Sequence, residues 1–295
     1  MTKTLFCILG PTAVGKTATA IKLARQLNTE IISADSRQFY QEISIGTAKP
    51  SKTELDLIPH HFIGHLSIHQ TYSAGDFERD ALAKLDDLFT KHDVVIAVGG
   101  SGLYVKALID GLDDMPKADE TLRTELNQLF ANEGIAALQQ RLLQLNPDLA
   151  NSTEIQNPQR VMRAIEITIA QKDGFVPNRK KNPRNFRTIK AVLNLPREQL
   201  YERINLRVDA MMQQGLLKEA RNMVPYQDFY ALQTVGYKEL FDYFNNQLTL
   251  EQAVTLIKQH TRNYAKRQLT WFKKEAPDNW FEPKQVDKLL HLLGS

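Results

Sequence analysis

The sequence predicts an α/β fold with a parallel sheet core, an inserted all-helical domain and a helical C-terminal part. Strand-like apolar runs alternate with amphipathic helical patterns in the N-terminal third, which is typical of a parallel sheet. Helical patterns then follow one another until a late apolar run that suits the same sheet. We therefore expect a discontinuous core of residues 1–115 and 188–295, interrupted by a helical insertion at 116–187.

The strand predictions rest on short apolar runs bounded by turn residues. They cover residues 5–9, 30–34, 94–98 and 188–195. The helix predictions rest on apolar residues spaced three and four apart, and they cover 16–27, 76–89, 119–132, 134–145 and 157–172. In the last of these, Asn157 can cap the helix and Pro158 suits its first position. From 199 to 260 the pattern is again helical, and it ends in the segment 261–274.

The first predicted strand runs into a turn that matches the P-loop pattern GxxxxGK[ST]. The turn consists of Gly10, Pro11, Thr12, Ala13, Val14, Gly15, Lys16 and Thr17. Backbone N–H groups in such a turn converge on one point, and the following helix adds partial positive charge there, so the turn binds phosphates. Lys16 would contact the terminal phosphate, and Thr17 would hold a Mg²⁺ that bridges phosphate oxygens. The pattern predicts a nucleotide-kinase-like core with its ligand at the carboxyl ends of the strands.

Polar residues follow two further predicted strands at that same edge. Asp35 ends the second strand, where its carboxylate could be a general base, a magnesium ligand or the cap of the next turn. After the strand at 94–98, many P-loop hydrolases carry an acidic residue that holds Mg²⁺, but this chain continues with glycines and Ser101. The missing acid argues against ATP hydrolysis. Ser101 either offers a hydroxyl to the site or serves only the turn.

Length and composition constrain the class of protein. The chain has 295 residues, 42% of them hydrophobic, which is enough for a sizeable core and about two domains. A net charge of +3 neither requires nor excludes a nucleic-acid partner. The single cysteine, Cys7, excludes an internal disulfide and fits a reducing compartment. Since no stretch approaches the ~20 apolar residues of a membrane span, we expect a cytoplasmic protein without membrane contact.

Two segments concentrate positive charge. The segment 174–197 has no acidic residue and contains Arg179, Lys180, Lys181, Arg184, Arg187, Lys190 and Arg197. The segment 261–274 also lacks acids and interleaves Arg262, Lys266, Arg267, Lys273 and Lys274 with Tyr264, Trp271 and Phe272. Positive charge beside aromatic rings suits a looped nucleic acid, although either segment alone could be a solvated face. Arg203 and Arg207, four residues apart, could clamp a diphosphate or pair with Glu198 and Glu202.

Eight motifs follow one another along almost the whole chain. They are GPTAVGKT (10–17), SADSRQFY (33–40), IGTAKP (45–50), GGSGLY (99–104), NPQRVMRAIE (157–166), RINLRVD (203–209), VGYKE (235–239) and TRNYAKRQLTWF (261–272). In these motifs the chain resembles the bacterial tRNA dimethylallyltransferase (isopentenyl-diphosphate:tRNA transferase) family. It departs at Ser101, where the family usually has threonine, and it lacks the C₂H₂ zinc-finger spacing of eukaryotic relatives.

The resemblance implies transfer of a dimethylallyl group from dimethylallyl diphosphate to the N6 amine of the adenosine 3′ of a tRNA anticodon. Pyrophosphate leaves and Mg²⁺ is required. The implied catalytic residues are Asp35, as the base that accepts the amine proton, with Ser101 and Arg207. A P-loop without the hydrolytic acid suits a pyrophosphate leaving group. The reacting amine and the diphosphate would meet in a channel through the core, and we expect a monomer.

The resemblance also implies which residues contact the tRNA anticodon stem-loop. They are Asp35, Ser36, Arg37, Gln38, Ser101, Arg123, Gln159, Arg160, Val161, Met162, Arg163, Lys266, Arg267 and Trp271. Two other interpretations stay open. A small-molecule P-loop kinase would share the core and use ATP, but it leaves the basic elements unexplained. A non-catalytic RNA-binding protein with a nucleotide switch would leave Asp35 without a task.

Overall fold

The computed structural model describes residues 2–116, 119–176 and 183–294, and the chain divides into two compact units. We call Met1–Gly111 with Pro183–Ser295 the core unit, and Leu112–Asn182 the helical unit. The helical unit ends before the predicted boundary at 187 because Arg184 already belongs to the core. Its guanidinium donates to the Leu108 carbonyl (3.1 Å) and to Glu78 (2.8 Å).

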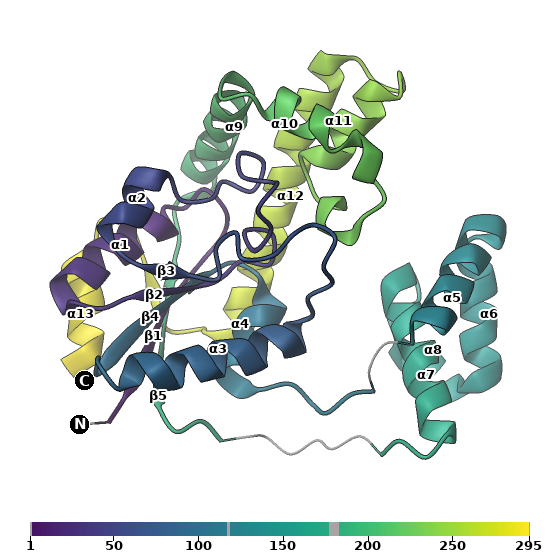
Figure 1. Ribbon diagram of the computed structural model, residues 1–295, viewed down its shortest axis with the longest axis horizontal. Helices are drawn as coiled ribbons and strands as arrows, with labels where there is room; N and C mark the ends of the chain where they lie inside the picture. Colours follow the sequence, from purple (N-terminus) through teal and green to yellow (C-terminus); the bar gives the residue numbers. More distant parts are fainter. Residues whose placement is uncertain (1, 117–118, 177–182, 295) are drawn as a thin grey trace. The chain divides into compact units, whose positions relative to one another are not determined.

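The core unit contains a parallel sheet, which confirms the predicted α/β class (Figure 1). Its strands are β1 (Thr4–Leu9), β2 (Ile31–Ala34), β3 (His60–His61), β4 (Val94–Gly99), β5 (Arg187–Leu193) and β6 (Trp280–Phe281), in the order β3-β2-β4-β1-β5-β6. Leu9 and Ala34 both lie beside Gly99 in the register. The residues that follow β1, β2 and β4 therefore leave the sheet at one edge. The two-residue strands β3 and β6 were not predicted because they are too short to show a periodicity.

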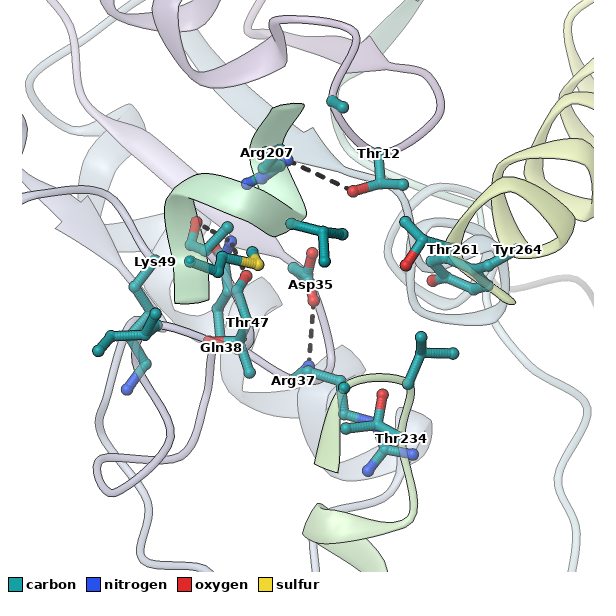
Figure 2. Close-up of a pocket in the computed structure, with 18 of the residues that line it drawn as sticks. Thr12, Asp35, Arg37, Gln38, Thr47, Lys49, Arg207, Thr234, Thr261 and Tyr264 are labelled. Carbon is teal, nitrogen blue, oxygen red and sulfur yellow. Dashed lines mark hydrogen bonds between the residues drawn. The ribbon is translucent and has the colours of Figure 1, made fainter. Parts of the chain in front are cut away.

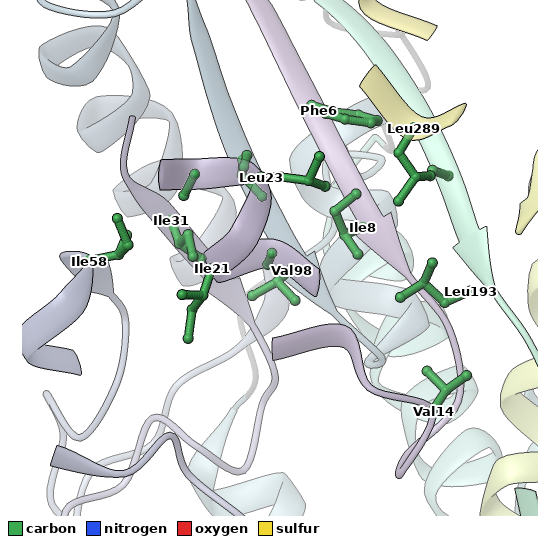
Figure 3. Packing of buried hydrophobic residues seen from close by; sticks show 14 of the residues in the cluster. Phe6, Ile8, Val14, Ile21, Leu23, Ile31, Ile58, Val98, Leu193 and Leu289 are labelled. Atoms are coloured by element: carbon green, nitrogen blue, oxygen red, sulfur yellow. The ribbon is translucent and has the colours of Figure 1, made fainter. Parts of the chain in front are cut away.

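Helices cover both faces of this sheet. On one face, α1 (Lys16–Leu27) and α13 (Val286–Gly294) bury Leu23 and Leu289 against Phe6 and Ile8 of β1 (Figure 3). On the other, α3 (Ala74–Phe89) and α4 (Gly102–Asp110) pack over the side that Cys7 faces. Because β1, β2 and β4 are buried on both faces, they consist almost entirely of apolar and small residues.

The C-terminal part is helical, as predicted, but it consists of separate helices. They are α9 (Arg197–Gln213), α10 (Leu216–Asn222), α11 (Tyr237–Phe244) and α12 (Leu250–Glu275), with short 3₁₀ turns at Val224–Tyr226 and Tyr230–Leu232. The basic segment 261–274 is therefore the second half of α12, whose first turn is capped by Thr249. A short helix, α2 (Lys52–Leu57), follows the IGTAKP motif.

The helical unit contains α5 (Glu120–Glu133), α6 (Ile135–Leu145), α7 (Pro147–Ser152) and α8 (Pro158–Lys172), and no strand occurs among its described residues. Its core includes Leu126, Leu138, Leu142 and Ile165, each fully buried. The predicted start of α8 is confirmed, since the Asn157 side chain accepts from the Arg160 N–H. Across the described residues of both units, no helix is long and apolar enough to traverse a lipid bilayer.

Candidate active site

The phosphate-binding turn between β1 and α1 forms as the sequence predicts. Gly10 has φ 144°, and a Cβ there would lie 2.5 Å from the Leu193 carbonyl oxygen of β5, so only glycine fits. Gly15, at φ 111°, ends the turn where α1 begins. Lys16 Nζ donates to the Pro11 carbonyl (2.9 Å), which folds the ammonium over the turn. The turn therefore places a cation where a phosphate would bind.

Electrostatics make this lysine responsive to a ligand. The pKa of Lys16 is lowered to about 8, chiefly by burial; the Asp35 carboxylate opposes this change, and the Arg207 guanidinium adds a smaller lowering contribution. An anionic diphosphate beside Lys16 would favour the charged ammonium and return this pKa toward its ordinary value.

Asp35 lies at the same edge, directly after β2. One carboxylate oxygen accepts the Arg37 backbone N–H (3.1 Å), so Asp35 does cap the next turn. This bond uses one of its two oxygens, and the carboxylate can accept a proton at the other. Figure 2 shows Asp35 inside a cleft, with Arg207 and Thr12 on one side and Thr234 on another. The cleft has a volume of about 1740 Å³, and the P-loop lines it as well.

Arg207 of α9 faces the P-loop across this cleft. Its Nη1 donates to Thr12 Oγ1 (3.4 Å), and burial lowers its pKa while Asp35 opposes that change. Arginine stays charged even so. Arg203, one turn earlier, places Nη2 3.5 Å from where a Gly15 Cβ would be. Both arginines thus face the phosphate-binding turn, and the structure favours the diphosphate clamp over surface pairing with Glu198 and Glu202.

Ser101 is a buried residue at the start of α4, and its hydroxyl ties neighbouring segments together. It accepts the Ser36 backbone N–H (3.1 Å) and lies 3.3 Å from the Ser36 hydroxyl. Tyr264 of α12 lines the same cleft and faces Asp35 (Figure 2). Although Tyr264 is 36% exposed, desolvation of its hydroxyl raises its pKa to about 12, and the Asp35 carboxylate contributes to that rise. The sequence indicated Tyr264 only as an aromatic residue in a basic segment.

Gln268 is a site residue that the sequence analysis missed. Its Oε1 accepts the Thr12 backbone N–H (2.9 Å), and its Nε2 donates to the Gly100 carbonyl (2.9 Å). The side chain is buried and joins the P-loop to the turn after β4. Its place one helical turn after Tyr264 was the available signal, because both residues then share the face of α12 that lines the cleft.

Replacing Gln268 by leucine removes both bonds at nearly constant size. Because the Thr12 N–H and the Gly100 carbonyl then lose their buried partner, we expect the free energy of unfolding to fall by about 2–3 kcal/mol. We also expect pyrophosphate affinity to fall about tenfold, to be measured by calorimetric titration. Thr270→Val, on the exposed side of α12, is the control and should change neither. Wild-type pyrophosphate affinity in Gln268→Leu would show that this bridge does not position the P-loop.

The IGTAKP motif forms one wall of the cleft. Glu219 of α10, also missed from the sequence, accepts the backbone N–H groups of Ser44, Ile45 and Gly46, each at 2.9 Å. The next carbonyls, at residues 47 and 48, accept from Gln38 Nε2 (3.2 and 3.1 Å). The amide of Gln38 is thereby held against this wall of the cleft (Figure 2).

In the helical unit, two of the expected RNA-contacting arginines share one carboxylate. Arg123 and Arg163 both donate to the carboxylate of Glu166, which is 3% exposed, and Arg123 also donates to Gln159 (3.0 Å). Arg160 lies on the surface and pairs with Glu154. Two guanidiniums on one carboxylate leave excess positive charge on this surface, as an RNA contact requires.

The structure corrects two of the residues expected at that surface. Val161 and Met162 are fully buried in the core of the helical unit, so their side chains do not face an RNA. Helical periodicity explains the difference, because a run of consecutive residues on α8 includes the positions that face α5 and α6.

The two basic segments also differ from each other. Arg179, Lys180 and Lys181 lie outside the described residues, and Arg184 is an interior ion pair with Glu78. On α12, by contrast, Lys266 and Arg267 are exposed, and Arg267 lines the cleft. Trp271 packs its indole against Gly102, where a Cβ would come within 2.7 Å of the ring, so packing already accounts for this residue.

The site offers few ligands for a metal ion. Among the described residues, no three His, Cys, Asp or Glu side chains gather in a metal-binding arrangement. Thr17 and Asp35 do line the same cleft, and they offer one hydroxyl and one carboxylate. This set fits Mg²⁺, which takes one or two protein oxygens together with phosphate oxygens and water.

Comparison with known proteins agrees with this geometry. The sequence model of a family described as IPP transferase matches residues 38–275. The chain belongs to the IPP transferase family. It is 51% identical to the tRNA dimethylallyltransferase of Christiangramia forsetii, covering 96% of this chain and 94% of that protein. The corresponding enzyme of Flavobacterium johnsoniae is 48% identical, covering 95% and 93%.

Solved structures extend the likeness to the fold. The full-length tRNA isopentenylpyrophosphate transferase of Bacillus halodurans is 37% identical and superposes with a TM-score of 0.73, covering 99% of this chain and 96% of that one. A eukaryotic dimethylallyltransferase solved while acting on tRNA gives a TM-score of 0.76 at 24% identity, which shows a shared fold. The family and the fold that the sequence motifs predicted are thereby confirmed.

Proposed function

We propose that this family member is a tRNA dimethylallyltransferase. It transfers the dimethylallyl group of dimethylallyl diphosphate to N6 of the adenosine 3′ of the anticodon, acting as a monomer in the cytoplasm, where tRNA is found. The observation that carries the proposal is that Asp35 and the P-loop line one cleft. A base and a diphosphate site must share a cavity for an amine to displace pyrophosphate.

The chain's own residues then divide the work. Asp35 accepts the proton that the N6 amine loses as its nitrogen bonds to the allylic carbon. The bond from that carbon to the diphosphate oxygen breaks, and Lys16 and Arg207 stabilise the negative charge on the departing pyrophosphate. A Mg²⁺ held by Thr17, with Asp35 near, would supply further positive charge to the phosphates. Ser101 holds the turn that carries Asp35, because its hydroxyl accepts the Ser36 backbone N–H.

The kinase alternative fits the chain less well. The strand β4 ends in Gly99 and continues into Gly100, with no acidic residue at its carboxyl end to hold Mg²⁺ on ATP. The exposed arginines of the helical unit and of α12 have no task on a small acceptor, whereas a looped RNA uses them.

Donor competition tests the proposal. The protein is incubated with Mg²⁺, an unmodified anticodon stem-loop and equimolar dimethylallyl diphosphate and ATP, and the RNA is weighed by mass spectrometry. We expect one added dimethylallyl group and no added phosphate. An RNA that gains nothing across several tRNA sequences, while ATP phosphorylates a small acceptor, would replace this proposal with the kinase.

The affinity for dimethylallyl diphosphate should depend on pH through Lys16. Its pKa of about 8 means that the ammonium is charged below pH 8 and loses its proton above it. We therefore expect Kd, measured by calorimetry, to rise with pH above 8, by up to about tenfold per unit. Ionisation of the terminal phosphate, near pH 6, lies below this window.

The control is Lys16→Arg, which stays charged and should show no such rise between pH 7 and 10. The stability of the ligand-free protein should rise over the pH range in which the affinity falls. From pH 8 to 10.5 the unfolded chain binds more protons at this lysine than the folded one, so Lys16 contributes increasing stability with pH. A wild-type Kd that is flat through pH 9 would contradict the role given to Lys16.

A further inference from the structure

Tyr230 presents an aromatic ring to solvent beside the cleft. It begins the 3₁₀ turn whose next two residues, Ala231 and Leu232, are buried, yet its own side chain is 61% exposed. Because these buried neighbours fix the backbone of the turn, the position of the Tyr230 Cα is fixed as well. Most of the ring is therefore available to a ligand.

Arg37 holds this ring in place. Its guanidinium lies 4.7 Å from the centre of the Tyr230 ring, in a cation–π contact. The same guanidinium donates to the carbonyls of Tyr230 (2.7 Å), Ala231 (3.3 Å) and Gln233 (3.4 Å). With the guanidinium over one part of the ring, the exposed part is oriented before any ligand arrives. A ligand that stacks there would not have to order the side chain.

Arg37 also links the Tyr230 ring to the Asp35 carboxylate. The backbone N–H of Arg37 donates to Asp35, and Arg37, Gln233 and Thr234 all line the cleft. Figure 2 shows Arg37 between Asp35 and Thr234. Tyr230 itself does not line the cleft, but its turn continues into residues that do, so the ring stands at the rim.

We propose that Tyr230 is a stacking platform for the unpaired nucleobase next to the target adenosine. The inference rests on the proposed function. Since the adenosine must enter the cleft to meet Asp35, the nucleotides on either side of it stay at the rim. An aromatic ring backed by a guanidinium accepts any base by its π-face. The partner is thus an anticodon-loop base, held without regard to its identity.

The test uses anticodon stem-loops that carry 2-aminopurine in place of the base on one or the other side of the target adenosine. Fluorescence of this analogue falls when it stacks. We expect wild-type protein and Tyr230→Phe to quench one of the two probes, and Tyr230→Ala to quench neither. The Kd for the stem-loop should rise about five- to hundredfold in Tyr230→Ala, because stacking on one ring contributes that much.

Phe244→Ala is the matched control, since Phe244 carries Arg221 at 4.3 Å in a similar cation–π contact, but Arg221 does not line the cleft, whereas Arg37 does. It should bind and quench as wild type does. If the wild type transfers the dimethylallyl group while Tyr230→Ala quenches and binds as well as wild type, Tyr230 is not a stacking platform, and the proposed function is unaffected. If the wild type neither binds the stem-loop nor modifies it, the proposed function itself is contradicted.

Discussion

Replacing Asp35 by asparagine should lower kcat for dimethylallyl transfer by about a hundred- to ten-thousandfold, which is the usual contribution of a general base. Asparagine keeps the size and still accepts the Arg37 N–H through its amide oxygen, so the turn after β2 should persist. It cannot accept the amine proton. We therefore expect the Kd values for tRNA and for dimethylallyl diphosphate to stay within about threefold of wild type, measured by filter binding and calorimetry.

Asp209→Asn provides the control for this prediction. Asp209 lies on α9 and pairs with Lys258, so the same chemical change occurs in the same unit but outside the cleft. Its kcat should remain near that of the wild type. An Asp35→Asn protein with unchanged kcat would show that Asp35 is not the base.

Replacing Arg207 by glutamine should lower kcat by about a hundred- to thousandfold. The guanidinium faces both the P-loop and Asp35, where negative charge develops as pyrophosphate leaves. Glutamine can donate a hydrogen bond but carries no charge. Since the charge matters most in the transition state, we expect kcat to fall more than the affinity for dimethylallyl diphosphate. Single-turnover kinetics with saturating RNA measure this difference.

Arg262→Gln is the comparison for Arg207. Arg262 of α12 donates to Asn205 (2.7 Å) and does not line the cleft, so it tests loss of an arginine charge from the same group of helices. It should leave kcat within about twofold of wild type. Equal losses in both variants would mean that general charge, and not the position of Arg207, supports catalysis.

The features that the sequence predicted correctly are those encoded locally. The P-loop was recognisable because one short segment contains the strand end, the glycines and Lys16. The place of Asp35 followed from a general property of parallel sheets, since the residue after β2 must emerge at the same edge as the residue after β1. The start of α8 at Asn157 followed from cap chemistry.

The features that the sequence did not reveal depend on contacts between distant segments. Gln268 bonds to Thr12, 256 positions away, and its place one helical turn after Tyr264 indicates only the face of α12, not the segments that it joins. Glu219 binds the turn at residues 44–46 in the same long-range way. On α8 the motif predicts RNA contacts for consecutive residues, whereas a helix turns neighbouring side chains toward different faces. Val161 and Met162 belong to the core for that reason.

The roles proposed for the cleft residues stay predictions until the reaction itself is located on the RNA. The most direct measurement compares two anticodon stem-loops, one with adenosine 3′ of the anticodon and one with purine riboside there, which lacks only the exocyclic amine. Each is incubated with Mg²⁺ and dimethylallyl diphosphate, digested to nucleosides and weighed. We predict one dimethylallyl group on that adenosine and none on the purine analogue. A dimethylallyl group on both RNAs, or at another nucleotide, would contradict the account.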